Sequence, residues 1–306
     1  MGAKGKIGLI GLAVMGANLA RNLAGHGIST VVYNRSHDKT ENFLKEFGSD
    51  TNLSGAAALE ELVNSLEKPR KIILMIKAGE AVDAMIAKLI PLLEKDDILI
   101  DGGNSFFEDT RRRSREMEAL GVHFVGMGVS GGEEGALHGP SLMPGGTREA
   151  YDALASILKA VSAKAEGEAC VDYMGPDGAG HYVKMVHNGI EYADMQMIAD
   201  TYFVMKNVLG MTAEEMADTW EMWNKGELSS YLVEITARIL RKADEMTGKP
   251  LVDVILDVAK QKGTGRWTSM SALALGVPAP TITEAVFART MSSRKEERLV
   301  LSKRYR

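Results

Sequence analysis

The sequence predicts an α/β region with a doubly wound parallel sheet, followed by an all-α region. Three observations point to this fold class. Short apolar runs alternate with amphipathic helical patterns through the first half, a glycine-rich turn follows the first run, and a long stretch with helical spacing opens the second half. At 306 residues the chain is long enough for two domains, each with its own apolar core.

The expected strands are short runs rich in Ile, Leu and Val. They cover residues 6–10, 30–33, 71–76, 97–101 and 122–126. Helical patterns such as 18–24 and 81–93 separate them, as in repeated strand–helix–strand units. Further helical spacing covers 179–209, 213–224, 229–246 and 251–259. We therefore expect a Rossmann-like domain at 1–178 and a helical domain at 179–306.

The composition excludes several classes of protein. With 36 basic and 41 acidic residues, a net charge of −5 and 45% apolar residues, the chain has no overall field that would attract nucleic acid. Its one cysteine, Cys170, cannot form an intramolecular disulfide, so we expect a cytoplasmic location. The first apolar run is too short and too broken by glycine to span a membrane. The basic stretch 289–306 is compatible with a solvated helix face, a partner contact or a cut end.

A glycine-rich turn follows the first expected strand directly and consists of Gly11, Leu12, Ala13, Val14, Met15 and Gly16. Glycine is needed there because the backbone bends sharply and approaches a pyrophosphate, which then faces the positive end of the next helix. Ala13 replaces the middle glycine of the strict dinucleotide pattern, so a simple tight turn is the alternative. The position after an N-terminal strand favours nucleotide binding.

The end of the second expected strand indicates which nucleotide binds. A site for NAD usually places Asp or Glu there to hold the ribose hydroxyls. This strand instead ends with Asn34, Arg35 and Ser36, and an arginine beside a hydroxyl and an amide suits a 2′-phosphate. We therefore expect NADP. The alternative is that Arg35 is a solvated loop charge and that Asp38 holds the ribose.

Two later strand ends carry further candidate contacts, because ligands of open parallel sheets bind beyond the carboxyl ends of the strands. Ile76, Lys77 and Ala78 follow one strand, and Asn104 follows another. We expect Lys77 and Asn104 near the nicotinamide half of the cofactor or near the substrate. Ordinary loop chemistry is the alternative for each.

A polar stripe lies on the first helix of the second half. Lys184, His187, Asn188 and Glu191 fall within one arc of roughly 60° on a helical projection. The opposite face carries Val183, Val186 and Ile190, which we expect to be packed in the interior. A partly buried lysine can act as a general base, and a partly buried glutamate can act as an acid. The alternative is an exposed face on which Lys and Glu form ion pairs.

Two glycine-rich loops are expected to complete a cleft beside this helix. Residues 126–132 offer the Ser130 hydroxyl and the amides of Gly131 and Gly132, which suit a carboxylate or a phosphate. Residues 261–267 offer Lys262 among small residues, which suits a phosphate. A tight connection is the alternative for either loop. Because the sequence has no His-Glu-x-x-His motif and no cysteine pair, we expect no metal.

Seven segments together carry a family resemblance, namely residues 10–16, 34–36, 101–105, 128–135, 139–146, 184–192 and 261–265. In this order and over essentially the whole chain, they resemble the 6-phosphogluconate dehydrogenase family. Ala13, which departs from the generic nucleotide pattern, is itself part of this family's turn. The resemblance implies NADP-dependent oxidative decarboxylation of 6-phosphogluconate to ribulose 5-phosphate and CO2 by a homodimer, in the pentose phosphate pathway.

The resemblance also implies roles for individual residues. Lys184 takes the proton of the substrate's 3-hydroxyl as hydride passes to NADP, and Glu191 later protonates carbon 1 of the enediol. The implied substrate contacts are Asn104, Ser130, Gly131, Gly132, His187 and Asn188 for the sugar acid, and Tyr192, Lys262 and Arg289 for the phosphate. The implied cofactor contacts are Gly11, Leu12, Ala13, Val14, Met15, Gly16, Asn34, Arg35, Ser36, Ile76, Lys77, Ala78 and Asn104.

Two other functions stay open on the sequence. Another β-hydroxyacid dehydrogenase would oxidise without decarboxylation and would leave Lys262 and Arg289 without a phosphate to bind. A non-catalytic NADP-binding module is the other alternative. Long members of the resembled family continue past the position of Arg306. We therefore expect cofactor binding, Lys184 and Glu191 to be retained, with weaker substrate binding or a different dimer.

Overall fold

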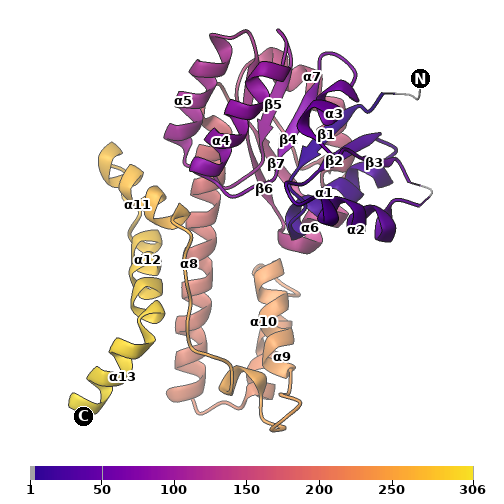
Figure 1. Ribbon diagram of the computed structural model, residues 1–306. Coiled ribbons are helices and arrows are strands. Elements are labelled where there is room, and N and C mark those ends of the chain that lie inside the picture. The colour runs from indigo at the N-terminus through magenta and orange to yellow at the C-terminus, as the bar shows by residue number, and fades with distance from the viewer. Residues whose placement is uncertain (1–3, 50, 306) are drawn as a thin grey trace. The chain divides into compact units, whose positions relative to one another are not determined.

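A computed structural model describes residues 4–49 and 51–305, which divide into two compact units, one ending at Met185 and the other starting at Val186 (Figure 1). The elements before the long helix are β1 (Ile7–Ile10), α1 (Val14–Gly25), β2 (Thr30–Tyr33), α2 (His37–Phe47), β3 (Leu53–Gly55), α3 (Leu59–Asn64), β4 (Lys71–Leu74), α4 (Glu80–Leu89), the 3-10 turn η1 (Ile90–Leu92), β5 (Ile98–Asp101), α5 (Phe107–Glu118), β6 (His123–Ser130), α6 (Gly132–His138), β7 (Ser141–Pro144), α7 (Arg148–Val161), β8 (Lys164–Ala165) and β9 (Glu168–Ala169). The elements that follow are α8 (Ala179–Asn207), α9 (Ala213–Trp223), α10 (Tyr231–Arg241), the 3-10 turn η2 (Leu251–Asp253), α11 (Thr264–Leu275), α12 (Pro280–Ser293) and α13 (Lys295–Arg304).

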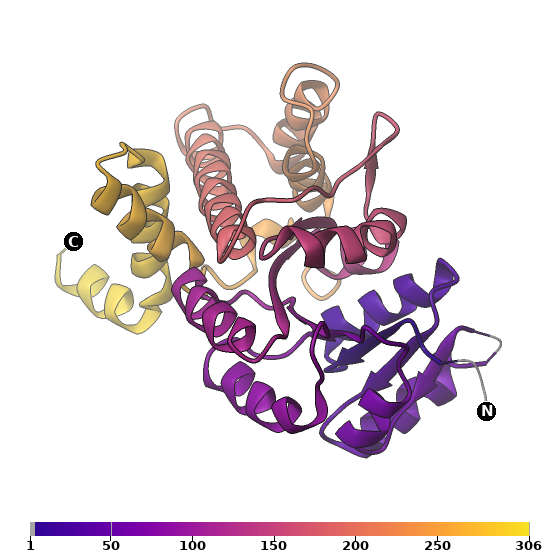
Figure 2. The same cartoon turned by 90° about the horizontal axis from the view of Figure 1, so that it is seen from above.

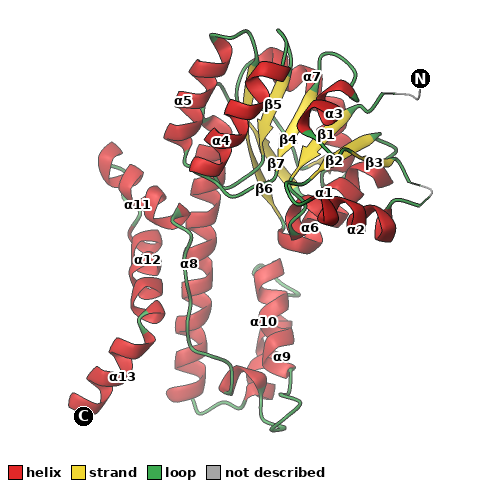
Figure 3. Ribbon diagram, in the orientation of Figure 1, coloured by secondary structure: helices red, strands yellow, loops and turns green. Residues whose placement is uncertain are grey.

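The first unit is built on a seven-stranded sheet with the strand order β3-β2-β1-β4-β5-β6-β7 (Figure 3). The pairs β1–β2, β1–β4, β2–β3, β4–β5 and β5–β6 are parallel, and β6–β7 is antiparallel. The order reverses between β1 and β4, and ligands of doubly wound sheets bind beside such a reversal, at the carboxyl ends of the strands. The predicted α/β region followed by helices is confirmed.

Both faces of this sheet are apolar, and helices flank it on both sides (Figure 2). In β5, Ile98 and Ile100 belong to one buried cluster, and Leu99 between them belongs to the other. In β4, Ile73 and its neighbour Ile72 divide in the same way. This alternation explains why the strands appear in the sequence as continuous apolar runs.

The strand predictions differ from the structure mainly at weakly apolar segments. The range 30–33 agrees with β2, whereas β6 continues to Ser130, four residues beyond the predicted end at 126. Strands β3 and β7 are not predicted at all. β3 has three residues, of sequence Leu-Ser-Gly, and β7 reads Ser-Leu-Met-Pro, so neither contains a β-branched apolar residue.

The predicted helix at 251–259 is wrong, because only the 3-10 turn η2 forms there. The segment contains Val252, Val254 and Ile255, whose branched side chains lower helix propensity. Side chains from later helices bond its backbone: Ala259 N donates to Ser292 Oγ at 2.9 Å. These bonds replace the intrahelical bonds that an α-helix would make.

The second unit has an apolar core of its own. Its buried members are Met205, Met216, Ala217, Trp220, Val233, Ala237 and Leu240, from α8, α9 and α10. On another part of α8, a Cβ added at Gly189 would lie 2.9 Å from Thr268 Oγ1, which shows how closely α11 approaches. Within the described ranges 4–49 and 51–305, no helix has both the length and the apolar character needed to cross a membrane.

The first turn of α8 packs directly against the sheet of the first unit. A Cβ added at Gly180 would lie 2.2 Å from Gly126 O and 2.3 Å from Met143 O. Both distances are far below van der Waals contact, so only glycine fits at this position. This packing places Lys184, one turn further along α8, beside Gly128 of β6.

His181, the next residue of α8, is enclosed in the same contact. Its side chain is 1% exposed, and its Nδ1 forms a 2.7 Å hydrogen bond with Thr110 Oγ1. Burial lowers the pKa of His181 below its ordinary value. The nearby Asp101 carboxylate acts in the opposite direction, and the Arg113 guanidinium adds to the lowering. His181 is therefore neutral in the folded protein near neutral pH.

Replacing Gly180 with alanine is expected to destabilise the first unit by roughly 2 kcal/mol or more, because the new methyl group meets two backbone oxygens that cannot move independently. Urea unfolding of the two proteins measures the difference. The matched control is Gly25→Ala, which also adds a methyl group to a helix but has no heavy atom within 4 Å of the added Cβ. Equal midpoints for Gly180→Ala and the wild type would contradict the close packing.

Lowering the pH from 7.5 to 5.5 is expected to cost up to about 1 kcal/mol of unfolding free energy through His181 alone. The unfolded chain takes up a proton near the ordinary histidine pKa, whereas the folded His181 does so only at lower pH. The stability that this group contributes is therefore present above that pKa and is lost as the pH falls below it. Denaturant unfolding at both pH values should show a smaller loss for His181→Gln, and an identical loss would rule out this origin.

Candidate active site

The glycine turn after β1 forms a close crossing of backbone segments. Gly11 has φ of +104°, and a Cβ there would lie 2.4 Å from Met75 O. A Cβ at Gly16 would lie 1.9 Å from Gly11 O. The N-cap residue of α1 is Ala13, whose methyl side chain cannot accept a hydrogen bond from the helix amides. The first amide groups of α1 are thus available to an anion.

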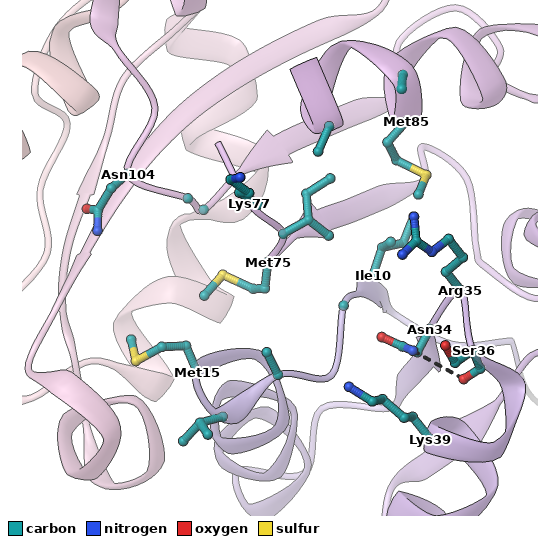
Figure 4. Close-up of a pocket in the computed structure, with 18 of the residues that line it drawn as sticks. Ile10, Met15, Asn34, Arg35, Ser36, Lys39, Met75, Lys77, Met85 and Asn104 are labelled. Carbon is teal, nitrogen blue, oxygen red and sulfur yellow. Dashed lines mark hydrogen bonds between the residues drawn. The ribbon is translucent and has the colours of Figure 1, made fainter. Parts of the chain in front are cut away.

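A cavity of about 700 Å³ opens in front of this turn, at the carboxyl ends of β1, β2, β4 and β5 (Figure 4). Its lining residues are Ile10, Gly11, Ala13, Val14, Met15, Asn34, Arg35, Ser36, Lys39, Met75, Ile76, Lys77, Ala81, Ala84, Met85, Lys88, Gly102, Gly103, Asn104 and Val129. Ten of the thirteen predicted cofactor contacts are among them. The cavity lies next to the point where the strand order reverses, as expected for a nucleotide site.

One side of the cavity groups Asn34, Arg35, Ser36 and Lys39 (Figure 4). Asn34 is held in place because its Oδ1 accepts from Leu12 N at 3.2 Å and its Nδ2 donates to Ser36 O at 3.1 Å. Two exposed cations beside a hydroxyl fit a phosphate. Asp38, the alternative ribose ligand, is not among the lining residues.

Lys39 is a candidate contact that the sequence reasoning missed. It lies in the first turn of α2, directly after the Asn34–Ser36 segment. A basic residue in the first turn of the helix that follows the second strand is the signal that could have identified it.

Asn104 lies on the opposite side of the cavity, with Met75 and Lys77 between it and Arg35 (Figure 4). Met15 lines the wall on the Asn104 side. The sequence reasoning missed Met75, since methionine has no motif of its own.

Three predicted cofactor contacts do not line this cavity: Leu12, Gly16 and Ala78. Leu12 is buried, and its amide bonds to Asn34. Gly16 packs against Gly11 O, as described above. Leu12 and Gly16 therefore contribute to the packing of the glycine turn and do not line the cavity.

The predicted sugar-acid loop lies at the end of β6, where Ser130 is the last strand residue. Gly131 has φ of +128° and Gly132 has φ of +61°, and α6 begins at Gly132. Only glycine adopts such angles readily at two successive positions. The chain thus passes from β6 into α6 through two glycines with positive φ directly after Ser130.

Lys184 lies one turn beyond His181 on α8, and its side chain is 6% exposed. A Cβ at Gly128 of β6 would lie 2.5 Å from Lys184 Cβ. The absent side chain at Gly128 is what allows the lysine stem to lie against the strand. Lys184 is thus an amine enclosed beside the end of β6, and enclosed amines are one kind of group that takes part in proton transfer.

The other three residues of the polar stripe lie close together in the second unit. His187 Nδ1 is 4.0 Å from Glu191 Oε2 and 3.4 Å from Asn188 Oδ1. The side chains of His187 and Glu191 are 38% and 43% exposed. The imidazole and the carboxylate are thus neighbours on one face of α8, at a separation longer than a hydrogen bond.

The apolar side of this helix does not follow the prediction. Val183 is 36% exposed and Ile190 is 51% exposed, although both were expected to lie in the interior. The buried positions of the first turns are instead His181, Lys184 and Met185. For Val183 the glycines of β6 are the reason, because they leave room for the Lys184 stem on the side where the first turns of the helix touch the sheet.

The predicted phosphate contacts also lie in the second unit. The Arg289 guanidinium lies 4.0 Å over the ring of Tyr192, and its Nη1 donates to Lys260 O at 2.9 Å. A Cβ at Gly265 would lie 2.6 Å from the Tyr192 ring. Lys262 is exposed two residues before α11. Arg289 and Tyr192 are thus in direct contact. The backbone at Lys260, two residues before Lys262, is hydrogen-bonded to Arg289.

Across residues 4–49 and 51–305, no three His, Cys, Asp or Glu side chains are grouped as they would be around a metal ion.

Comparison with protein families gives two matches that together cover nearly the whole chain. Residues 6–175 match the NAD binding domain of 6-phosphogluconate dehydrogenase. Residues 180–306 match the 6-phosphogluconate dehydrogenase C-terminal domain.

Individual relatives agree. The NADP(+)-dependent, decarboxylating 6-phosphogluconate dehydrogenase of Bacillus subtilis (strain 168) is 63% identical over 300 residues, covering 98% of this chain and 64% of the relative. A 6-phosphogluconate dehydrogenase structure from Plasmodium falciparum, studied with NADP+ and with 6-phosphogluconate, has a TM-score of 0.93 at 47% identity and covers 98% of this chain. The 3-hydroxyisobutyrate dehydrogenase of Salmonella typhimurium has a TM-score of 0.73 at 19% identity and shares the fold.

The chain spans 64% of the length of the B. subtilis and P. falciparum proteins. Within that span, the family matches cover both units. The chain belongs to the 6-phosphogluconate dehydrogenase family.

Proposed function

We propose that this chain carries out NADP-dependent oxidative decarboxylation of 6-phosphogluconate to ribulose 5-phosphate and CO2, a reaction of the pentose phosphate pathway. The observation that carries the proposal is the cavity beside the glycine turn. It has Arg35, Ser36 and Lys39 at one side and Asn104 at the other. The names of the B. subtilis and P. falciparum relatives support this choice of cofactor and substrate.

The cavity fits NADP in shape and charge. The uncapped start of α1 suits the pyrophosphate, and the two cations with the Ser36 hydroxyl suit the 2′-phosphate. When bound, NADP accepts a hydride from the substrate carbon that carries the hydroxyl. The nicotinamide half then belongs on the side of Met15 and Asn104.

Lys184 is the proposed general base. Its buried stem against Gly128 restricts its movement, so its amine is held in place for the proton of the substrate hydroxyl. Loss of CO2 from the resulting β-keto acid sends electrons into the adjacent ketone, and Lys184 returns the proton there. Glu191, paired with His187, then protonates carbon 1 of the enediol.

The substrate contacts are proposed on the same basis. Donors suited to the sugar acid come from Ser130, Gly131, Gly132 and Asn104 in the first unit. His187 and Asn188 in the second unit supply others. Tyr192, Lys262 and Arg289 supply a hydroxyl and two cations suited to its phosphate.

The proposed working form is a cytoplasmic homodimer. The second unit exposes large apolar side chains, among them Phe203 at 61%, Val208 at 69% and Phe287 at 60%. Apolar surface of this kind is typical of subunit interfaces. The net charge of −5 argues against a nucleic-acid partner.

The direct test measures NADPH formation and CO2 release together, with the purified chain and 6-phosphogluconate. Equal amounts of the two products are expected, because each hydride transfer leads to one decarboxylation. Turnover of 3-hydroxyisobutyrate but not of 6-phosphogluconate would contradict the proposed substrate. Cofactor binding with neither reaction would contradict the proposed activity.

Lys184→Met is expected to lower kcat by at least about a thousandfold, since it removes the general base and keeps the stem. The Kd for NADP should stay within about threefold, because Lys184 does not line the cavity. Stopped-flow absorbance and fluorescence titration measure the two quantities. Lys206→Met, on the same helix but paired with Asp253, is the control and should behave as the wild type. Near-normal turnover by Lys184→Met would show the base assignment to be wrong.

Arg35→Met is expected to raise the Kd for NADP by about 10- to 100-fold, because charge-assisted hydrogen bonds to the 2′-phosphate are lost. The Kd for NAD should hardly change. Lys45→Met, at the far end of α2 and outside the cavity lining, is the matched control. Equal weakening of NADP and NAD binding would contradict a phosphate site at Arg35.

A further inference from the structure

Two neighbouring loops form the side of the cavity that carries Asn104. One follows β4 and contributes Ile76 and Lys77, and the other follows β5 and contributes Gly103 and Asn104 (Figure 4). Both loops are short, and both lie on the side of the cavity proposed to hold the nicotinamide half of NADP. The distance between the two loops therefore affects how that half of the cofactor fits.

A buried arginine that does not line the cavity contacts both loops. Arg113 of α5 is 1% exposed. Its Nε and Nη2 donate to the two carboxylate oxygens of Asp83 at 2.8 Å each, and its Nη2 also donates to Gly79 O at 3.0 Å. Gly79 ends the loop that carries Lys77, and Asp83 lies in the first turn of α4, directly after it.

The other side of the same guanidinium faces the second loop. Arg113 Nη1 lies 3.5 Å from Asp101 Oδ2. Asp101 is fully buried, its Oδ1 accepts from Gly103 N at 3.0 Å, and its Oδ2 accepts from Ser105 Oγ at 2.6 Å. The Asp101 carboxylate thus folds the loop that carries Asn104, and Arg113 pairs with that carboxylate.

Arg113 and Asp83 form a hydrogen-bonded ion pair. Hydrogen bonds from Arg113 hold the pKa of the Asp83 carboxyl well below its usual range, so the carboxylate stays ionised. A bidentate arginine–carboxylate pair fixes orientation as well as distance. Lysine at 113 would keep a charge but would lose the planar fork that reaches both loops.

We propose that Arg113, bridging Asp83 and Asp101, is a positioning residue that sets the spacing of the two loops around the nicotinamide half of the cofactor. This proposal rests on the proposed function, because it assigns the cavity to NADP. Arg113, Asp83 and Asp101 do not line the cavity, so the bridge acts through the loops it holds.

The test compares two ligands that differ in the half of the cofactor they contain. NADP spans the whole cavity, whereas 2′,5′-ADP contains only the adenosine and 2′-phosphate half. In Asp83→Ala, whose replaced side chain is 39% exposed, the Kd for NADP is expected to rise about tenfold. The Kd for 2′,5′-ADP should stay within about twofold, and kcat should fall about tenfold. Asp83→Asn, which keeps an acceptor for Arg113, should lie between Asp83→Ala and the wild type.

Two further variants make the result specific to Arg113. Arg113→Lys should show the same selective loss of NADP affinity. Arg112→Ala is the matched control, because Arg112 also donates to Asp83 Oδ1 at 2.9 Å but is 46% exposed and has Glu116 as its other hydrogen-bond partner. It should bind both ligands as the wild type does.

The outcomes separate this proposal from the function on which it rests. If the wild-type chain binds both ligands and Asp83→Ala weakens both equally, or neither, the loop-spacing role of Arg113 is wrong and the cofactor assignment stands. If the wild-type chain binds neither ligand, the cofactor assignment itself is wrong and the role of Arg113 fails with it. Selective loss of NADP binding in Asp83→Ala and Arg113→Lys, with Arg112→Ala unchanged, supports the proposal.

Discussion

The contact between the first turn of α8 and strand β6 is the constraint on which the candidate chemistry depends. Three glycines make it possible: Gly180 on the helix, and Gly126 and Gly128 on the strand. Each occupies a position where a single added carbon would overlap a neighbouring atom. Because the helix lies so close, Lys184 can be buried against β6 near the end of the strand, where Ser130 begins the glycine loop. A lysine on a more distant helix would not be enclosed in this way.

Much of the fold could be predicted from periodicity, and the limits have physical causes. Apolar runs identified β1, β2, β4, β5 and β6 because a strand buried on both faces leaves a continuous apolar signature. Segment 251–259 misled because its spacing is helical while its branched residues and the bonds from α12 favour an irregular path. A local sequence pattern cannot reveal a hydrogen-bond partner such as Ser292, which lies 33 residues from Ala259 along the chain.

The candidate site was predictable where backbone geometry demands particular residues. The glycine turn and the Asn34–Ser36 segment line the cavity because a strand end and a helix start leave few choices there. Lys39 and Met75 were missed, since neither a surface lysine nor a methionine departs from ordinary usage. The exposure of Val183 was missed for a different reason: the side of the first turn of α8 that is buried depends on the glycines of β6, which lie more than fifty residues earlier in the sequence.

The alternating burial of the strands also divides each strand into regions with different freedom to vary. The middle of β1, β4 or β5 is covered on both faces, so almost any change there costs stability. Residues just past the strand ends, such as Arg35, Ser36 and Lys39, are exposed and contribute little to either core. The residues proposed to bind the 2′-phosphate therefore lie outside both apolar cores of the sheet. Substitutions at these exposed positions alter the lining of the cavity and leave the packing of the sheet unchanged, so the binding site and the stability of this scaffold can vary separately.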